Sequence, residues 1–131
     1  SKIFLFSPWL DLALENPEIK KIDPTDPFLG IEGLQKAGIA YAGGADRKHY
    51  MLSPINGTFE GLADVYLFIG SRDVLVADAR ELKVRMARQN QKLHYYEYKD
   101  MIHVWMFLNF KESRDAFDEI IRLIGDGGRG V

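Results

Sequence analysis

The stretch VYLFIGSRDVLVADARELKVRM, residues 65–86, decides the fold. It opens with the apolar run VYLFI, which is too short for a typical helix and therefore predicts a buried strand at 65–69. Gly70 and the polar residues after it end that strand, and apolar residues at helical spacing then predict a helix at 79–90. Asp78, followed three residues later by a glutamate, resembles a capping box at the start of this helix. The stretch is therefore typical of a strand–turn–helix unit.

Further strands and helices are predicted on either side of this unit. The apolar run KIFLF predicts a strand at 2–6, and the aromatic run LHYYEY predicts a strand at 93–98. A helix is predicted at 31–42, where a Gly-Gly pair supplies the stop, and another at 112–124, where apolar residues form a continuous stripe. Residues 15–30 hold three prolines and predict a long loop, because X-Pro disfavours helix.

The order of these elements indicates the fold class. Alternation of strands with helices is typical of βαβ units, so we expect an α/β fold with three mainly parallel strands and helices on both faces. The 131 residues suffice for a single domain, 1–131. The glycine-rich end at 126–131 is expected to be a frayed tail.

Composition argues against several classes of function. A net charge of −2 disfavours a nucleic-acid partner, and the lack of cysteine excludes disulfides, thiolate chemistry and cysteine-containing zinc sites. The histidines at 49, 94 and 103 show no i, i+4 pairing, so we expect neither a metal nor another cofactor. No apolar run reaches the roughly 18–20 residues of a membrane span, and no secretory signal is visible. We therefore expect a cytoplasmic protein, whose natural start is missing because Ser1 runs directly into an apolar strand.

The spacing of one carboxylate and one imidazole points to a site. Asp73 lies four residues past the strand at 65–69, and His103 lies five residues past the strand at 93–98. If these parallel strands are neighbours, their carboxyl ends are about 5 Å apart and both side chains emerge at the same edge of the sheet. A carboxylate there can accept the imidazole Nδ1–H and orient the ring, as in the acid–base half of a catalytic triad.

Other interpretations of these residues stay open. His103 sits in the apolar stretch YKDMIHVWMFLNF, so a core histidine with a satisfied hydrogen bond is the plain alternative. Asp78 fits a helix cap better than a catalytic acid. His94 lies inside a strand and is expected to pack against Tyr96, and His49 lies in a polar loop and is expected to be solvated.

Several blocks of the chain together resemble a known family, the esterase/lipase group related to hormone-sensitive lipase, which has the α/β-hydrolase fold. The resemblance extends from about residue 3 to residue 124. The blocks are LFSPWLDL at 5–12, DPFL at 26–29, YAGGAD at 41–46, LSPINGTFEGL at 52–62, VYLFIGSRDVLVADARELKVRM at 65–86 and YYEYKDMIHVWMF at 95–107.

This resemblance implies roles for individual residues. It makes Asp73 the triad acid and His103 the triad base, and it matches the three strands to the sixth, seventh and eighth strands of the family sheet. The substrate would be a small acyl ester. Four aromatic residues are candidates for an acyl or alcohol pocket, with ordinary core packing as the alternative for each: Trp9, Phe28, Trp105 and Phe107.

The chain departs from the family at the nucleophile. In the family a serine in G-x-S-x-G precedes the acid and the histidine. None of the five serines here, at 1, 7, 53, 71 and 113, has glycines at the required positions. The His-Gly-Gly oxyanion motif is also absent, and Gly43-Gly44 follows a predicted helix as a cap. The sequence thus resembles the C-terminal half of a hydrolase.

Two functions follow as hypotheses. The first is that the parent protein is a serine carboxylesterase or lipase for which this chain supplies acid and base, but not the nucleophile. The second is a non-catalytic module that folds and self-associates. In both cases the strand at 2–6 would present an open apolar edge, so we expect a homo-oligomer through these residues. A G-x-S-x-G upstream in the gene would favour the first hypothesis.

Overall fold

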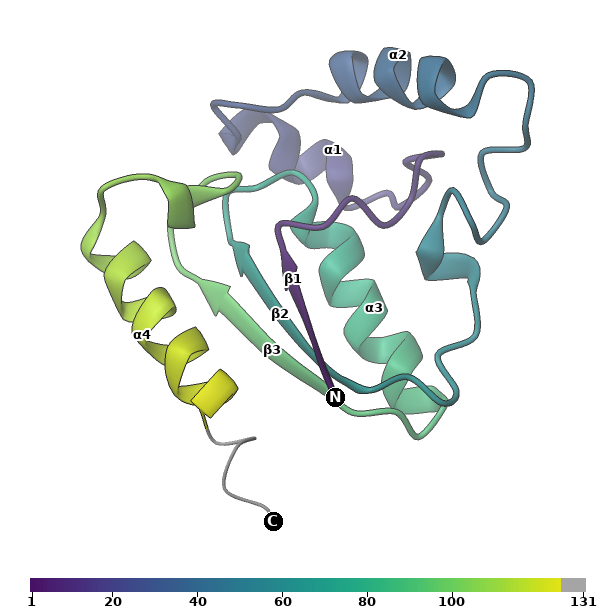
Figure 1. The fold of residues 1–131 in the computed structure, drawn as a ribbon. Helices are drawn as coiled ribbons and strands as arrows, with labels where there is room; N and C mark the ends of the chain where they lie inside the picture. The colour runs from purple at the N-terminus through teal and green to yellow at the C-terminus, as the bar shows by residue number, and fades with distance from the viewer. Residues whose placement is uncertain (126–131) are drawn as a thin grey trace.

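The structure, a computed structural model, describes residues 1–125 and is built around a parallel three-stranded sheet (Figure 1). Its strands are β1 (Lys2–Phe6), β2 (Asp64–Gly70) and β3 (Leu93–Tyr98), in the spatial order β1-β2-β3. The predicted α/β architecture with three parallel strands and flanking helices is therefore confirmed. The expected frayed tail at 126–131 lies outside the described residues.

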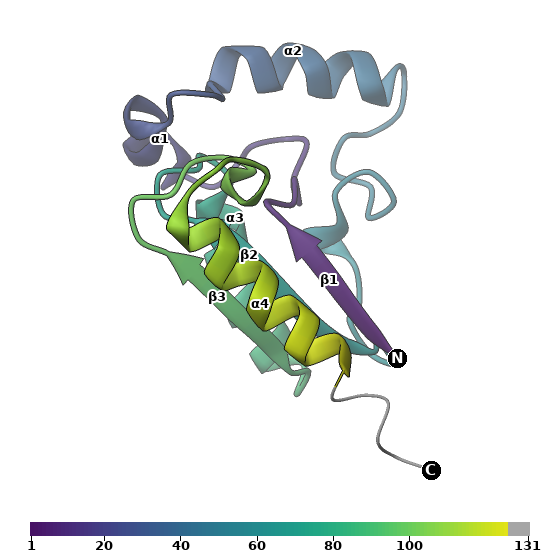
Figure 2. The same cartoon turned by 60° about the vertical axis from the view of Figure 1, so that its left-hand side comes forward.

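Helices cover both faces of the sheet and its carboxyl end. The helices are α1 (Ile19–Ile22), α2 (Ile31–Ala42), α3 (Val76–Arg88) and α4 (Lys111–Gly125), with short 3₁₀ turns at Asp23–Thr25, Pro54–Asn56 and Trp105–Phe107. Figures 1 and 2 show α3 on one face, α4 on the opposite face, and α1 and α2 beyond the carboxyl ends of the strands. None of these helices is long and apolar enough to cross a membrane.

Strand β2 joins two hydrophobic clusters, one on each face of the sheet. Because side chains alternate along a strand, Leu67 points to the cluster on the α3 side and Phe68 points to the cluster on the α4 side. Both side chains are fully buried, and each such burial stabilises the fold by about 1.5–3 kcal/mol. Packing on both faces thereby holds the central strand in place. The position of the turn that follows β2 is fixed as a result.

Helix α3 begins three residues earlier than predicted, and the predicted capping box is wrong. The backbone enters the helix directly from the turn after β2, where Asp73 Oδ1 accepts a hydrogen bond of 2.9 Å from the N–H of Leu75. Asp78 therefore lies inside the first turn of the helix rather than before it. The predicted loop at 15–30 also contains local structure, namely α1 and the following 3₁₀ turn.

Candidate active site

Asp73 and His103 meet at the carboxyl ends of β2 and β3. These strands are paired neighbours, with Gly70 opposite Tyr98 at the end of the ladder. His103 Nδ1 lies 2.9 Å from Asp73 Oδ2, which confirms the prediction that the two side chains are within hydrogen-bond reach. Asp73 is completely buried, whereas 20% of the His103 side chain is exposed. The pair thus joins an inaccessible carboxylate to an imidazole that solvent can reach.

The turn that carries Asp73 is held by the segment before α2. Asp26 Oδ2 accepts a 2.8 Å hydrogen bond from the N–H of Val74, the residue next to Asp73. Arg72, on the other side, donates from Nε to the carbonyl of Thr25 at 3.1 Å. The proline-rich loop therefore braces the acid, a role that its composition did not reveal.

The loop that carries His103 crosses directly over the end of β2. The N–H of Arg72 donates to the carbonyl of Met101 at 3.0 Å, and Ser71 Oγ accepts from the N–H of Asp100 at 2.8 Å. A Cβ atom on Gly70 would lie only 2.2 Å from the Met101 carbonyl oxygen. The absence of a side chain at Gly70 is what allows this close approach.

Ser7 anchors the other side of the same loop. Val104, directly after His103, has φ of 46°, a left-handed conformation that costs a β-branched residue about 1–3 kcal/mol. Its N–H donates to Ser7 Oγ at 3.1 Å, and the N–H of Ser7 donates to the carbonyl of Phe68 at 2.9 Å. The sequence excluded Ser7 as the nucleophile and predicted no other role for it in the site. Ser7 lies directly after a strand and before a proline, and this position was the available sign in the sequence of a structural role.

The arrangement is suited to general base chemistry. If Asp73 accepts the Nδ1–H, the imidazole is held as the tautomer whose Nε2 carries the free lone pair. The buried carboxylate also stabilises the imidazolium that forms when Nε2 takes a proton. Among residues 1–125, no group of three or more histidine, aspartate or glutamate side chains is placed to hold a metal ion.

The remaining candidate residues differ in how far they are exposed. Trp105 is fully buried in the cluster on the α4 side, 4.4 Å from Tyr98 between ring centroids, whereas Phe107 is 69% exposed. Their contact with substrate stays a prediction. Trp9 is half-buried next to Gly38 of α2, and Phe28 is exposed.

The other two histidines make ring contacts outside the site. His94 stacks on Tyr66 of the neighbouring strand at 4.2 Å, rather than on Tyr96, which stacks on Phe68. His49 is exposed, as expected from its polar loop, and it stacks on Tyr50. Neither ring has a contact with Asp73 or His103 among these interactions.

Comparison with known proteins shows which family the chain resembles. Residues 1–107 match the family model described as alpha/beta hydrolase fold. An acetyl-hydrolase of Streptomyces hygroscopicus is 31% identical over 114 residues, which are 86% of this chain and 38% of that protein. An esterase of Acinetobacter venetianus is 28% identical over 132 residues, covering 92% of this chain and 41% of that protein. The chain thus spans about two fifths of the length of these relatives.

Solved structures show the same fold. An esterase/lipase from an uncultured bacterium superposes with a TM-score of 0.87 at 27% identity, covering 95% of this chain and 42% of that one. The protein EstE5, soaked with p-nitrophenyl butyrate, has a TM-score of 0.81 at 29% identity, covering 88% and 39% of the two chains. A hormone-sensitive lipase from a metagenome library, 24% identical, shares the fold with a TM-score of 0.89 over 94% of this chain and 42% of that one.

Proposed function

The chain belongs to the α/β-hydrolase fold family, and we propose that it is the part of a serine carboxylesterase or lipase that supplies the triad acid and base. Asp73 would be the acid and His103 the base in the hydrolysis of small acyl esters. The observation that carries the proposal is the 2.9 Å contact between His103 Nδ1 and the fully buried Asp73 carboxylate. Relatives named esterase and acetyl-hydrolase support an ester as the substrate class.

In the proposed reaction His103 acts twice. Its Nε2 takes the proton of a serine hydroxyl as that oxygen attacks the ester carbonyl, and it then donates the proton to the leaving alcohol, which leaves an acyl-serine. Water then attacks the acyl-serine with the same two proton transfers through Nε2, which releases the carboxylic acid and restores the serine. Asp73 keeps the ring oriented through both steps. Backbone N–H groups of another segment would stabilise the oxyanion. Phe107, exposed on the 3₁₀ turn that follows the base, would contact the acyl or alcohol group, and Trp105, buried on the same turn, would anchor that turn in the cluster on the α4 side.

The serines of this chain support a nucleophile supplied by a different segment. Ser53 and Ser113 are buried, and their hydroxyls donate to the carbonyls of Arg47 and Trp105. The hydroxyls of Ser7 and Ser71 accept backbone N–H groups of the loop around His103, at Val104 and Asp100. These four hydroxyls therefore have structural hydrogen bonds of their own.

We predict that the 131-residue chain alone forms no covalent adduct with a fluorophosphonate probe. Such a probe reacts with an activated serine, and removal of the nucleophile leaves only weak residual catalysis. Intact-mass spectrometry after incubation measures the adduct directly. An active serine esterase in the same reaction is the positive control, and stoichiometric labelling of any serine of this chain would contradict the proposal.

The second candidate function, a self-associating module, is favoured by the open edge of β1. The sheet order leaves β1 paired only with β2, and all five of its side chains are partly exposed. Figure 2 shows this strand at the outer edge of the sheet. Unpaired backbone groups next to apolar side chains are a template for pairing with another chain. Two copies could join their β1 edges across a two-fold axis and form a six-stranded sheet.

We expect a homodimer through residues 2–6 in solution. Size-exclusion chromatography with light scattering should give a mass of twice 15.0 kDa at high micromolar concentration, falling on dilution. Slower hydrogen exchange of the β1 amides in the concentrated sample would place the contact on that strand. A monomer at high concentration, with residues 2–6 ordered, would contradict this expectation.

A further inference from the structure

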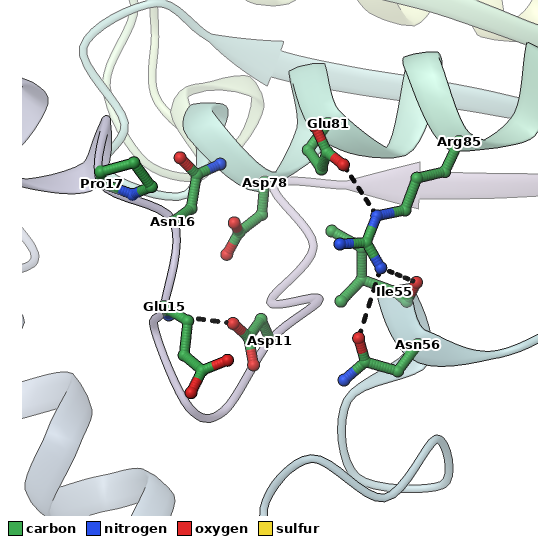
Figure 3. Close-up of a pocket in the computed structure, with 9 residues that line it drawn as sticks. All are labelled: Asp11, Glu15, Asn16, Pro17, Ile55, Asn56, Asp78, Glu81 and Arg85. Carbon is green, nitrogen blue, oxygen red and sulfur yellow. Dashed lines mark hydrogen bonds and ion pairs between the residues drawn. The ribbon is translucent and has the colours of Figure 1, made fainter.

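A polar pocket of about 410 Å³ lies on the α3 side of the molecule, among residues other than the Asp73–His103 pair. Its size is within the range of small-molecule sites, about 300–1,000 Å³. Figure 3 shows its walls, which come from the segment after β1, the 3₁₀ turn at Pro54–Asn56 and helix α3. The lining residues are Asp11, Glu15, Asn16, Pro17, Ile55, Asn56, Asp78, Glu81 and Arg85.

Asp78 is the unusual group in this pocket. It is only 1% exposed, yet its Oδ2 atom has no hydrogen-bond partner among residues 1–125. Figure 3 shows its carboxylate pointing from α3 into the space between Asn16 and Asp11. The amino end of α3 favours a negative charge at this position. It donates no hydrogen bond to Oδ2, however, so this oxygen still carries the cost of burial without a partner.

The cations around the pocket are already paired with other carboxylates. Arg85 Nε contacts Glu81 at 2.8 Å, and Arg85 NH1 donates to the Ile55 carbonyl at 3.0 Å. Lys48 pairs with Glu15 at 2.6 Å. These two ion pairs neutralise two of the four acidic residues of the pocket. Asp11 and Asp78 form no ion pair of this kind among residues 1–125.

The other unpaired carboxylate, Asp11, is held differently. Its oxygens accept hydrogen bonds from the N–H groups of Ala13, at 2.8 Å, and Glu15, at 3.1 Å. Asp11 is therefore fixed in place as an anion facing Asp78. Burial is the main cause that raises the pKa of Asp78 to about 6. The polar side chain of Asn16 and the charge of Arg85 act in the opposite direction, and the charge of Asp11 adds to the increase.

We propose that this pocket binds a small organic cation through a primary ammonium group, with Asp78 Oδ2 as its main acceptor and Asp11 as the second negative charge. An ammonium has three N–H donors and no acceptor, so it fits an unpartnered buried oxygen beside a second carboxylate. A divalent metal fits less well. Asp11 is occupied by backbone donors, and no metal-ligating group of three or more acidic or histidine side chains exists among residues 1–125.

The proposal is tested on the 131-residue chain with n-butylammonium as the probe. Chemical-shift changes in NMR should cluster at the amides of Asp11, Asn16 and Asp78 and should saturate with rising concentration. Tetramethylammonium, a cation without N–H donors, and neutral n-butanol should give much smaller changes. Equal shifts with all three compounds, or no saturable shift at these amides with n-butylammonium, would overturn the proposal and leave a pocket for solvent only.

A matched pair of variants distinguishes binding of n-butylammonium in the pocket from a general effect of protein charge. Asp78→Asn keeps the shape of the side chain and removes its charge, so n-butylammonium should bind at least about tenfold more weakly. Asp118→Asn removes an exposed charge on α4, on the opposite face, and should leave binding unchanged. Thermal unfolding of both variants verifies the fold. Unchanged affinity in folded Asp78→Asn would also overturn the proposal.

The natural ammonium could belong to a free amine or to a lysine side chain of a protein segment. A blocked Gly-Lys-Gly tripeptide distinguishes these sources. Tighter binding of the tripeptide than of n-butylammonium supports a lysine side chain, because the flanking backbone then contributes contacts. Weaker binding supports a free amine. This test does not involve ester hydrolysis, so its result is independent of the proposed function.

Discussion

Asp73→Asn is expected to lower kcat by roughly 10³–10⁴-fold in the esterase formed when this chain follows a G-x-S-x-G segment. The aspartate is fully buried, and its Oδ2 atom is 2.9 Å from His103 Nδ1. An asparagine amide in that place can donate to Nδ1, which favours the wrong imidazole tautomer and puts the proton on Nε2. The base would then have no lone pair for the serine hydroxyl, while KM for a p-nitrophenyl ester should change little.

The fold should survive this substitution. Asparagine keeps an oxygen that can accept the hydrogen bond from Leu75 at the start of α3, now made by Asp73 Oδ1. Asp118→Asn, which removes an exposed carboxylate on α4, is the matched control and should keep full activity. In the 131-residue chain itself, loss of the downfield imidazole Nδ1 proton signal would report the same change. Unchanged turnover would move the acid role elsewhere, and Asp78 would be the first residue to test.

The strands and the acid–base pair could be predicted from the sequence because their signals are local and strong. Short apolar runs bounded by turn residues defined β1 and β3 at the observed residues, and β2 to within one residue at each end. Parallel neighbours end at one edge of a sheet, so the positions of Asp73 and His103 relative to those strands predicted that they meet if the two strands are neighbours, and the family resemblance supported the same pair.

The remaining features depend on contacts between distant parts of the chain. The start of α3 is set by Asp73 and by Asp26, 48 residues before the Val74 N–H that it binds. The left-handed conformation of Val104 is stabilised by Ser7, 97 residues away. Burial of Asp78 results from packing of the segment after β1 against α3, and no periodicity within the helix encodes it.

Gly70→Ala is expected to disrupt the site through the backbone. A Cβ atom there would lie 2.2 Å from the carbonyl oxygen of Met101 and 2.4 Å from its carbonyl carbon. Backbone atoms cannot rotate away as a side chain can, so the loop carrying His103 must shift by about 1 Å to restore ordinary contact. Overpacking of this kind costs about 1–3 kcal/mol of stability. A misplacement of this size also costs about 10²-fold in catalysis.

Gly33→Ala separates this effect from the general consequences of adding a methyl group. Gly33 lies within α2, and a Cβ atom there would meet nothing within 4 Å. An alanine at an unstrained helical position should stabilise the chain by about 0.4–1 kcal/mol, because it reduces the freedom of the unfolded state. Urea unfolding of both variants measures the difference in free energy of unfolding.

The imidazole Nδ1 proton signal then shows whether the Asp73–His103 contact survives in Gly70→Ala. The turn that carries Asp73 is held by β2 and by Asp26, so Asp73 does not move with this loop. Val104 is bound to Ser7, so a shift at Met101 is confined to the few residues just before Val104. His103 is one of those residues, and it should therefore lose its contact before the sheet itself unfolds. If Gly70→Ala matched Gly33→Ala in stability and kept the proton signal, the close approach over β2 would not be what positions the base.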